Sequence, residues 1–525
     1  MNIYEAIVIG SGPSGVIGAQ KLIDNNINTL LIDAGFDVKE SSPLTSNEKQ
    51  ESHNLVDGFH KNLLVQENFK TKFNKNNLIQ NKLNSLGYSK YIDFDLSNID
   101  YNPTLLKGGL SNVWGGSILP LRNEDFTDWP IQLSDMKKYY KYAMSYIGAE
   151  NYDDDLNKIF SLENYDQSHK IDRSIMVDYI LGKYKIYKKK LNLNGIFIGN
   201  SRIAVEKQSC PYCINCNLND KFPLIFNSSN NLRKLQKNNL FKYKKNNIVE
   251  KIIENEKFIT IFCKDLDNNE FKYRCKRLYI GAGFLSTSKI MLDSYKAKNI
   301  QINQIEAKDS QYFILPAILL RNLKKNQNKI NFSQLFIEIF NKDISNNYAH
   351  LQIYTYNNLV DDYIKHKYFL FYKILYPFIK NFIRNRIIFI QGYLHNKDSS
   401  KASIKFENIN GSQKYKIEIK KNDKTDGVIR KIISLLAYNF YSVGFFPLSF
   451  LMRIGKFGAG HHSGATFPMK KIFKKNSSNL WGVPYGFTKV HIIDSSVLPS
   501  INSSTITLTV MANAARIADN HNNFK

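Results

Sequence analysis

Two short apolar runs near the start of the chain are separated by a stretch with helical character. The first run covers residues 6–9 and the second covers residues 29–32. Runs of this length predict buried strands, and the stretch between them predicts a helix. A strand, a helix and a second strand in such close succession indicate a parallel βαβ unit.

The turn after the first strand carries three glycines in the spacing Gly-x-Gly-x-x-Gly, at Gly10, Gly12 and Gly15. Gly10 permits the tight turn, Gly12 lets the backbone approach a pyrophosphate, and Gly15 lets the helix pack closely on the strand. We therefore expect phosphates at the start of this helix, beside Ser14.

The second run ends in Asp33, 18 positions past the third glycine (33 minus 15). An acid at this distance accepts hydrogen bonds from ribose hydroxyls in dinucleotide-binding units. The whole unit predicts dinucleotide binding, and on its own it leaves FAD and NAD both open.

Further along the chain, alternating apolar and polar positions predict a small antiparallel sheet at residues 247–254, 258–263 and 271–280. An apolar strand then ends in Gly281-Ala-Gly and a helix follows. Residues 131–200 are predicted to be mostly helical. More strands are predicted at 313–320, 350–356, 387–394 and 402–406.

Composition adds limits to this picture. The chain has 525 residues, which predicts two or three domains, and 43% hydrophobic residues exclude wholesale disorder. The net charge of +26 is spread along the chain and no nucleic-acid motif accompanies it, so we predict no nucleic-acid partner. The polar residues 36–100, with a helical patch at 69–86, are predicted to form a surface subdomain or lid.

The beginning of the chain and its cysteines bear on location. The first strand follows Met1 almost at once, which leaves no room for a signal peptide. Five cysteines, three of them clustered, suit a reducing compartment. We therefore expect a cytoplasmic protein.

Two stretches raise the question of a membrane. Residues 365–386 interleave Lys and Arg with Tyr, Phe, Leu and Ile, and 21 uncharged residues lie between Lys431 and Arg453 (453 minus 431 minus 1). The second stretch is long enough to span a bilayer, but it contains Asn439, Gly444 and other polar or helix-breaking residues. We predict a buried helix pair or the wall of a substrate channel, with peripheral membrane contact as the alternative.

Three clustered cysteines, Cys210, Cys213 and Cys216, have the spacing that begins a ferredoxin signature. The position of a fourth ligand is occupied by Asp220. A structural zinc, a cluster and a relic without metal all remain open. Because no fourth cysteine follows in the motif, we predict no bound metal, with these three cysteines as the weak candidates.

A second glycine-rich segment runs from Lys107 to Gly116, with a tryptophan in its middle. So many glycines around one large ring exclude a regular helix and favour a loop whose backbone lies against a planar ligand. A glycine-rich turn with a packing tryptophan is the alternative for the segment taken alone.

This loop, the nucleotide unit and the Trp129-Pro130 pair together resemble the glucose-methanol-choline (GMC) family of FAD-dependent oxidoreductases, in particular bacterial members that act on sugars and polyols. The resemblance implies FAD contacts at Gly109, Ser111, Asn112, Trp114 and Gly281. Some members attach the flavin through a histidine in this loop. None occurs here between Lys107 and Gly116, so we expect noncovalent FAD.

Two adjacent histidines, His461 and His462, lie between glycine turns near the C-terminus. From the residues alone a structural histidine is as good an interpretation as a catalyst. The family places its catalytic histidine seven residues before a Met or its equivalent, and 469 minus 7 is 462. His462 is therefore the predicted base, since imidazole titrates near the working pH. Ala465 replaces the usual glycine, which leaves the register open to His461.

The remaining C-terminal motifs complete the resemblance. The usual His or Asn partner of the base aligns with Thr505, whose hydroxyl can orient a substrate oxygen but cannot serve as a base. Asp494 and Ser495 are implied contacts of the FAD pyrophosphate and ribityl chain. A helix from Thr507 to 519 is predicted to aim its N-terminus at the flavin ring. This closure of the C-terminus onto the first unit decides for FAD over NAD.

The sequence thus predicts an α/β fold with a Rossmann-like FAD-binding domain (1–130, 200–300 and 456–525) and an α+β substrate domain with an antiparallel sheet (131–199 and 301–455). The predicted activity is that of an FAD-dependent dehydrogenase or oxidase acting on the CH–OH group of a sugar, polyol or glycoconjugate. The electron acceptor, whether oxygen, quinone or protein, stays open. The alternatives are a flavoenzyme that returns hydride to substrate, and a catalytically silent flavin-binding or membrane-associated assembly protein.

Overall fold

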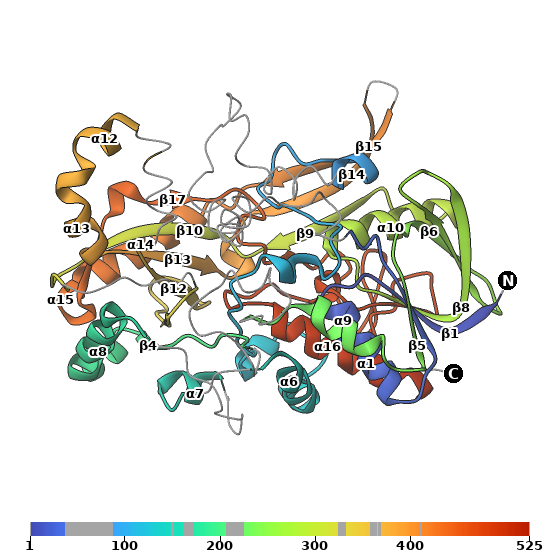
Figure 1. Cartoon of the computed structure of the whole chain (residues 1–525), viewed down its shortest axis with the longest axis horizontal. Coiled ribbons are helices and arrows are strands. Elements are labelled where there is room, and N and C mark those ends of the chain that lie inside the picture. The colour runs from blue at the N-terminus through green and yellow to red at the C-terminus, as the bar shows by residue number, and fades with distance from the viewer. Residues whose placement is uncertain are drawn as a thin grey trace, which may run out of the picture.

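A computed structural model describes residues 2–36, 88–148, 152–160, 173–205, 225–323, 332–356, 365, 369–409 and 412–523. Within these ranges the chain forms three sheets with helices packed around them. Figure 1 shows one seven-stranded sheet toward each end of the long axis and the five-stranded sheet between them. The predicted α/β class is confirmed.

The first sheet begins with the predicted strand–helix–strand unit. Its order is β5-β2-β1-β8-β7-β6, with β19 beside β8. Residues 6–9 of β1 and all of β2 are buried, as expected for parallel strands covered on both faces. The bounds are β1 Ile3–Ile9, β2 Thr29–Ile32, β5 Phe241–Lys244, β6 Ile248–Glu254, β7 Ile259–Lys264, β8 Glu270–Ile280 and β19 Val490–Ile492.

Strand β8 changes its partners along its length. Its first half pairs antiparallel with β7, from Glu270 to Cys275. Its second half pairs parallel with β1, and Leu278 to Ile280 also pair parallel with β19. One strand therefore joins the N-terminal unit, the central meander and the C-terminal segment.

Helices cover this sheet and connect it to its surroundings. α1 packs against α16, α16 packs against α6, and α10 packs against β6. α16 is buried over nearly its whole length, which is unusual for a terminal helix and shows that it belongs to the core. The bounds are α1 Pro13–Asp24, α6 Leu133–Ile147, α9 Ser228–Leu235, α10 Phe284–Ala297 and α16 Thr507–Asp519.

The second sheet is antiparallel, in the order β16-β10-β13-β12-β11-β4, with β17 beside β10. One face is aliphatic and packs against α8 and α14. The bounds are β4 Ile196–Asn200, β10 Tyr312–Leu319, β11 Leu335–Ile339, β12 Ala349–Thr355, β13 Ile387–Leu394, β16 Phe445–Pro447, β17 Arg453–Ile454, α8 Ile175–Leu193 and α14 Thr425–Tyr438.

The opposite face of this sheet is buried but polar. We call it the polar face, and it carries Tyr312, Glu338, His350, Gln352, Tyr354, Gln391 and Tyr393. Buried residues of these types are rare in a core unless they serve hydrogen bonding or function.

The third sheet has the order β18-β9-β14-β15-β3. The strand predicted at 402–406 is found here as part of β14, which pairs with β9 and β15 and not with the strands predicted at 313–320, 350–356 and 387–394. Alternation shows that a strand exists but does not name its neighbours. The bounds are β3 Phe94–Asp95, β9 Gln304–Asp309, β14 Lys401–Ile409, β15 Ser412–Lys420 and β18 Ser463–Gly464.

The uncharged stretch between Lys431 and Arg453 does not form one long helix. α14 ends at Tyr438, the short α15 follows over Phe440–Val443, and Gly444 turns the chain with a φ of +85° before β16. Within the ranges given above, the structure has no helix that is both long and apolar enough to cross a bilayer.

The smaller elements complete the described fold. They are α5 Tyr88–Tyr91, α7 Asp155–Phe160, α12 Phe369–Ile374, α13 Tyr376–Arg386 and 3-10 turns at Gly109–Asn112, Asn123–Phe126, Asn396–Asp398, Ser449–Leu451, Ser495–Val497 and His521–Asn523. The predicted helical patch at 69–86 and the cluster Cys210, Cys213 and Cys216 lie outside the described residues.

Candidate functional site

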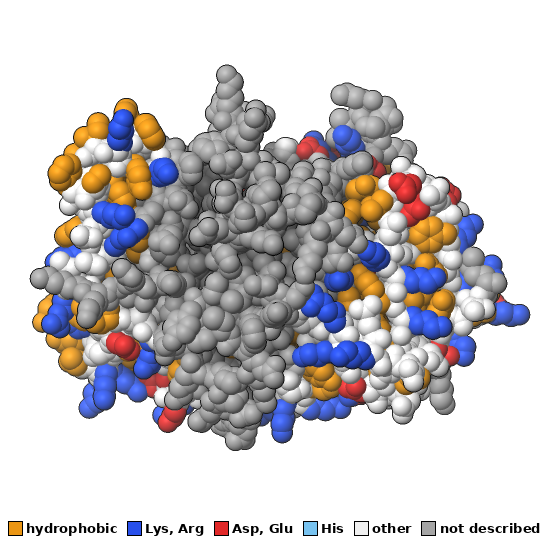
Figure 2. Space-filling view, viewed as in Figure 1, with side chains coloured by type: hydrophobic (Ala, Val, Ile, Leu, Met, Phe, Trp, Pro, Cys, Tyr) orange, Lys and Arg blue, Asp and Glu red, His pale blue; other side chains and the backbone are white. Residues whose placement is uncertain are grey.

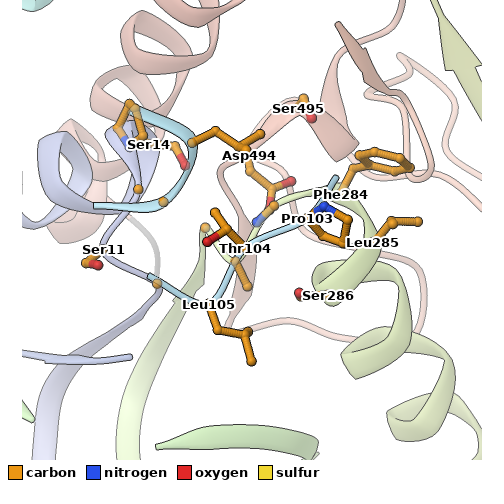
Figure 3. A pocket seen from close by; sticks show the side chains of 18 of the residues that line it. Ser11, Ser14, Pro103, Thr104, Leu105, Phe284, Leu285, Ser286, Asp494 and Ser495 are labelled. Carbon is orange, nitrogen blue, oxygen red and sulfur yellow. The ribbon is translucent and has the colours of Figure 1, made fainter. Parts of the chain in front are cut away.

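A large pocket opens where the carboxyl ends of β1, β2 and β8 meet. Its empty space, open mouth included, is about 1310 Å³. Figure 3 shows lining residues from well-separated parts of the chain, among them Ser11, Leu105, Phe284 and Asp494. The carboxyl edge of a parallel sheet is where ligands of such folds bind.

The three predicted glycines have different surroundings in this pocket. A Cβ on Gly10, which has a φ of +95°, would lie 2.5 Å from the carbonyl oxygen of Gly281. A Cβ on Gly15 would lie 1.9 Å from the carbonyl oxygen of Gly10. Gly12 has no atom within 4 Å of its Cβ position. Gly10 and Gly15 are thus required for packing, and Gly12 leaves open space for a ligand.

Helix α1 begins directly at the pocket. Pro13 and Ser14 line it, and no side chain caps the first backbone N–H groups of the helix. Uncapped N–H groups at a helix N-terminus carry partial positive charge and bind anions. This end of the pocket can hold a phosphate group.

Asp33 also lines the pocket and is largely buried. Its carboxylate accepts hydrogen bonds from the hydroxyl of Ser11 and from the hydroxyl of Tyr243 at 3.5 Å. Burial raises the pKa of Asp33 to about 6. The hydrogen bonds from Ser11 and Tyr243 act in the opposite direction and lower this pKa. Ser11 Oγ in turn accepts from the backbone N–H of Gly108 at 2.9 Å. Ser11 thereby joins the two glycine-rich loops. The sequence did not reveal this role, because Ser11 occupies a position that the glycine motif leaves open.

The second glycine-rich loop lies against the first. Gly109, Ser111 and Trp114 line the pocket, and a Cβ on Gly109 would lie 3.3 Å from the Cα of Gly12. Ser111 Oγ donates to the carbonyl of Gly108 at 2.6 Å. The indole of Trp114 donates to the carbonyl of Phe226 at 2.8 Å, which fixes the ring.

The side chain of Asn112 points into the loop itself. Its amide donates to the carbonyls of Lys107 at 2.9 Å and Gly109 at 2.7 Å, and its carbonyl accepts from the amide of Asn227 at 2.9 Å. Asn112 is not among the residues that line the described part of the pocket. The structure thus shows that Asn112 shapes the loop, and the ligand contact that the family resemblance implies stays a prediction.

The C-terminal segment is tied to the second glycine turn by Asp494. Its carboxylate accepts from the N–H of Gly283 at 2.9 Å, from the hydroxyl of Thr287 at 2.5 Å and from the N–H of Ser496 at 2.9 Å. Burial raises the pKa of Asp494. Asp494, Ser495 and Gly281 all line the pocket (Figure 3).

Helix α16 presents a second N-terminus to the pocket. Thr507 lines the pocket and begins the helix, and no side chain caps its first turn. Thr505, two residues earlier, is buried, and its hydroxyl has no hydrogen-bond partner among the described residues. A hydroxyl in this state is free to bind a ligand oxygen.

The two predicted histidines have different environments. His461 lines the pocket, lies 5.3 Å from the ring of Tyr101 and has its Nδ1 3.2 Å from the carbonyl of Ala459. His462 stacks on Tyr393 of the polar face with ring centroids 4.8 Å apart. Its buried Nδ1 has no hydrogen-bond partner among the described residues.

Both imidazoles are neutral at physiological pH. Loss of water around the ring lowers the pKa of His461 to about 4. The same cause lowers the pKa of His462 to about 3, with a smaller contribution from neighbouring His350 and His461. The neutral form is the one that can accept a proton.

A hydrogen-bonded network runs across the polar face beside His462. His350 Nδ1 lies 2.6 Å from a carboxylate oxygen of Glu338, and both side chains are 0% exposed. The amide of Gln352 donates to His350 Nε2 at 3.1 Å, which places the proton of His350 on Nδ1, where it is donated to Glu338. The hydroxyl of Tyr354 donates to the carbonyl of Gln352 at 2.8 Å. The hydrogen bonds of this network therefore all point one way, from Tyr354 through Gln352 and His350 to Glu338.

The sequence interpretation missed this network. Its signal is the alternation of His350, Gln352 and Tyr354 with apolar residues in one strand. Such alternation normally indicates a strand with one face in water. Here both faces are buried, so the polar residues lie in the interior of the protein.

No protein-family model matches the chain, and no curated protein matches it in sequence. Among solved structures, the chain is similar to pyridoxine 4-oxidase from Mesorbium loti, with a TM-score of 0.61 and 10% identity. The similarity covers 99% of this chain and 100% of that chain. At this identity the likeness establishes a common fold over the whole length.

Proposed function

We propose that the protein is an FAD-dependent oxidoreductase that oxidises an alcohol group of a sugar, polyol or glycoconjugate, with His462 as the base. The observation that carries this proposal is the assembly of one pocket from motifs that span residues 9 to 510. The glycine loop, the acid, the second glycine-rich loop and the C-terminal helix all face it. A single glycine motif would support much less.

The residues of the pocket fit a dinucleotide of the size of FAD. Gly12 leaves space for a pyrophosphate that the N-terminus of α1 would bind, and buried Asp33 would accept from ribose hydroxyls. The N-terminus of α16 would lie toward the flavin ring, where its positive end favours negative charge. Bound FAD would supply the acceptor for the hydride that leaves the alcohol carbon.

The protein's own contribution to the reaction is to bind, orient and deprotonate the alcohol. Since Nδ1 of His462 is enclosed, we assign acceptance of the hydroxyl proton to Nε2. The hydroxyl of Thr505 and the polar face would hold the substrate's other oxygens. An array of buried Tyr, Gln and His side chains suits a substrate with several hydroxyl groups.

The fold supports an oxidoreductase in general terms, because the similar solved structure is by name an oxidase of pyridoxine. One fold hosts many substrates, so the substrate class rests on the polar face and not on this likeness. The two-part division predicted from the sequence, an FAD-binding domain and a substrate domain, belongs to the same proposal.

The first experiment is the visible spectrum of the purified protein, followed by anaerobic addition of sugars and polyols. We expect an FAD spectrum that one compound of the panel bleaches. A protein without flavin would overturn the proposal. A bound flavin that no alcohol reduces would contradict the proposed activity and favour a silent scaffold.

The His462→Ala variant tests the base. We expect it to retain FAD and to lose the reductive step by about 10²–10⁴-fold, the usual contribution of a general base. In the wild type, kcat/KM should show no ionisation near pH 6.5, because the pKa of His462 is lowered to about 3. Wild-type rates in His462→Ala would remove it as the base.

A further inference from the structure

One end of the molecule carries a surface that is both apolar and basic. We call it the α13 surface, and it consists of α12, α13 and residues 438–456. Figure 2 shows apolar side chains interspersed with Lys and Arg at the end of the molecule that holds α12 and α13 in Figure 1. Its exposed apolar side chains are Phe369, Leu370, Ile374, Leu375, Phe378, Ile379, Phe382, Tyr438, Phe440, Tyr441, Phe446, Phe450, Leu451 and Ile454.

These helices turn their apolar residues toward solvent. No side chain of α12 is buried, and α13 buries only Tyr376. Phe378 is 85% exposed, Phe450 76% and Leu370 71%. An ordinary surface helix buries its apolar stripe against the core. A contiguous exposed patch of this kind marks an interaction site.

The charge of the α13 surface has one sign. Residues 369–386 contain Lys373, Lys380, Arg384 and Arg386, and residues 438–456 contain Arg453 and Lys456. Neither segment contains Asp or Glu. The occupant should therefore be anionic. A second copy of this chain fits poorly, since it would bring two basic surfaces together in a protein of net charge +26.

We propose that the α13 surface docks on an anionic lipid bilayer. Phe378 and Phe450 are the two most exposed phenylalanines of the surface, and exposed aromatic side chains insert between lipid headgroups. The six basic residues would meet the negative surface potential of the leaflet. An acidic protein could pair with the basic residues, but it would also need a cavity that fits the exposed aromatic side chains. A bilayer accommodates such side chains without a preformed cavity, so it is the better match.

The α13 surface is attached to the strand that builds the polar face. The hydroxyls of Tyr376 in α13 and Tyr356 lie 2.7 Å apart. Tyr356 follows Tyr354 by two residues, and a Cβ on Gly115 in the second glycine-rich loop would lie 3.6 Å from the Tyr354 hydroxyl. Docking would thus fix the position of the polar face relative to the bilayer. The docking proposal stands on the surface alone and does not depend on the proposed reaction.

The test is flotation of the full-length purified protein with vesicles of phosphatidylcholine, alone or mixed with phosphatidylglycerol. We expect binding to the mixed vesicles and weak binding to phosphatidylcholine alone. Higher salt should weaken the binding because it screens the charges. The double variant Phe378→Ser, Phe450→Ser should bind the mixed vesicles at least about tenfold more weakly, since it loses both inserted rings.

Ile472 offers a matched control. It is 79% exposed and lies among Lys470, Lys471, Lys474 and Lys475, but outside the α13 surface. Ile472→Ser should bind vesicles like the wild type. Because all three substituted residues are exposed, thermal unfolding should be unchanged and would verify that the variants fold.

Several results would overturn the docking proposal. These are no binding to the mixed vesicles at low salt, equal binding by the double variant, or an equal loss in Ile472→Ser. Dimerisation of the wild type that the double variant abolishes, without vesicle binding, would assign the surface to a second copy. Full competition by soluble polyglutamate, with no effect of the Phe substitutions, would assign it to an acidic protein.

Discussion

At the scale of single residues, Asp33 combines a predicted role with an unpredicted environment. The distance from the glycine motif pointed to a ribose-binding acid, and the structure buries this carboxylate beside Ser11. Without a ligand hydroxyl, burial disfavours its charged form and raises its pKa to about 6.

This shift predicts how stability depends on pH in flavin-free protein. The folded-state pKa of about 6 exceeds the ordinary value of 3.8. The contribution of Asp33 to folding stability is therefore fully present below pH 3.8 and is lost as pH rises through 6. Asp33→Asn stays neutral throughout. The difference in unfolding free energy, variant minus wild type, should therefore grow between about pH 4 and 6 and then level off. Urea denaturation at several pH values measures it, and a difference independent of pH would contradict the shift.

Some properties of single residues can be predicted from the sequence and others cannot, for a physical reason. Glycine positions with strained φ or crowded Cβ space leave a mark in the sequence, as at Gly10 and Gly15. The direction of a side chain leaves none, so the inward turn of Asn112 could not be read from its place in a loop. The roles of His462 and Thr505 remain predictions.

At the scale of elements, the polar face of the second sheet is the feature with most consequence. Glu338 of β11 holds His350 of β12, and His350 holds Gln352 of the same strand, so one carboxylate orients side chains on both strands. Periodicity located these strands, but their pairing order and the burial of both faces arise from tertiary packing. The same limit explains why periodicity located β14 but did not show that it belongs to the third sheet.

The Glu338→Gln variant tests the orienting role. The amide oxygen of Gln can accept from His350 Nδ1–H only as a neutral group, without the charge that strengthens the bond to the carboxylate, so His350 and Gln352 should be held less firmly in their orientation. We expect FAD to be retained while kcat/KM falls about tenfold to a hundredfold through misplaced substrate. Steady-state kinetics with flavin content measure this. Glu418→Gln, at a half-exposed ion pair with Lys405, is the control. Unchanged kinetics in Glu338→Gln would remove the network from substrate binding.

At the scale of the whole molecule, the ends of the chain are parts of one core. β1 and β19 both pair with β8, and α1 packs on α16. The sequence indicated this closure because its motifs at both ends belonged to one resemblance. The extent of the buried contact between α1 and α16 became evident only from the packed structure.

Removal of residues 490–525 should therefore abolish folding of the first sheet and not merely activity. The deletion exposes the apolar sides of β8 and α1, both of which are buried in the full chain. We expect an aggregated or protease-sensitive product without FAD. A deletion of 524–525 alone is the control. A soluble deletion product with native circular dichroism and bound FAD would contradict this role of the C-terminus.

The partner changes of β8 also determine the order in which the protein can mature on the ribosome. β1 and β2 emerge first, yet β8 follows some 240 residues later and β19 a further 210 residues after the end of β8 (490 minus 280). Until then the apolar strands β1 and β2 lack neighbours that complete their sheet, and unpaired strands of this kind are prone to aggregate. The pocket at the carboxyl edge of this sheet can therefore form only after both later strands have been synthesised.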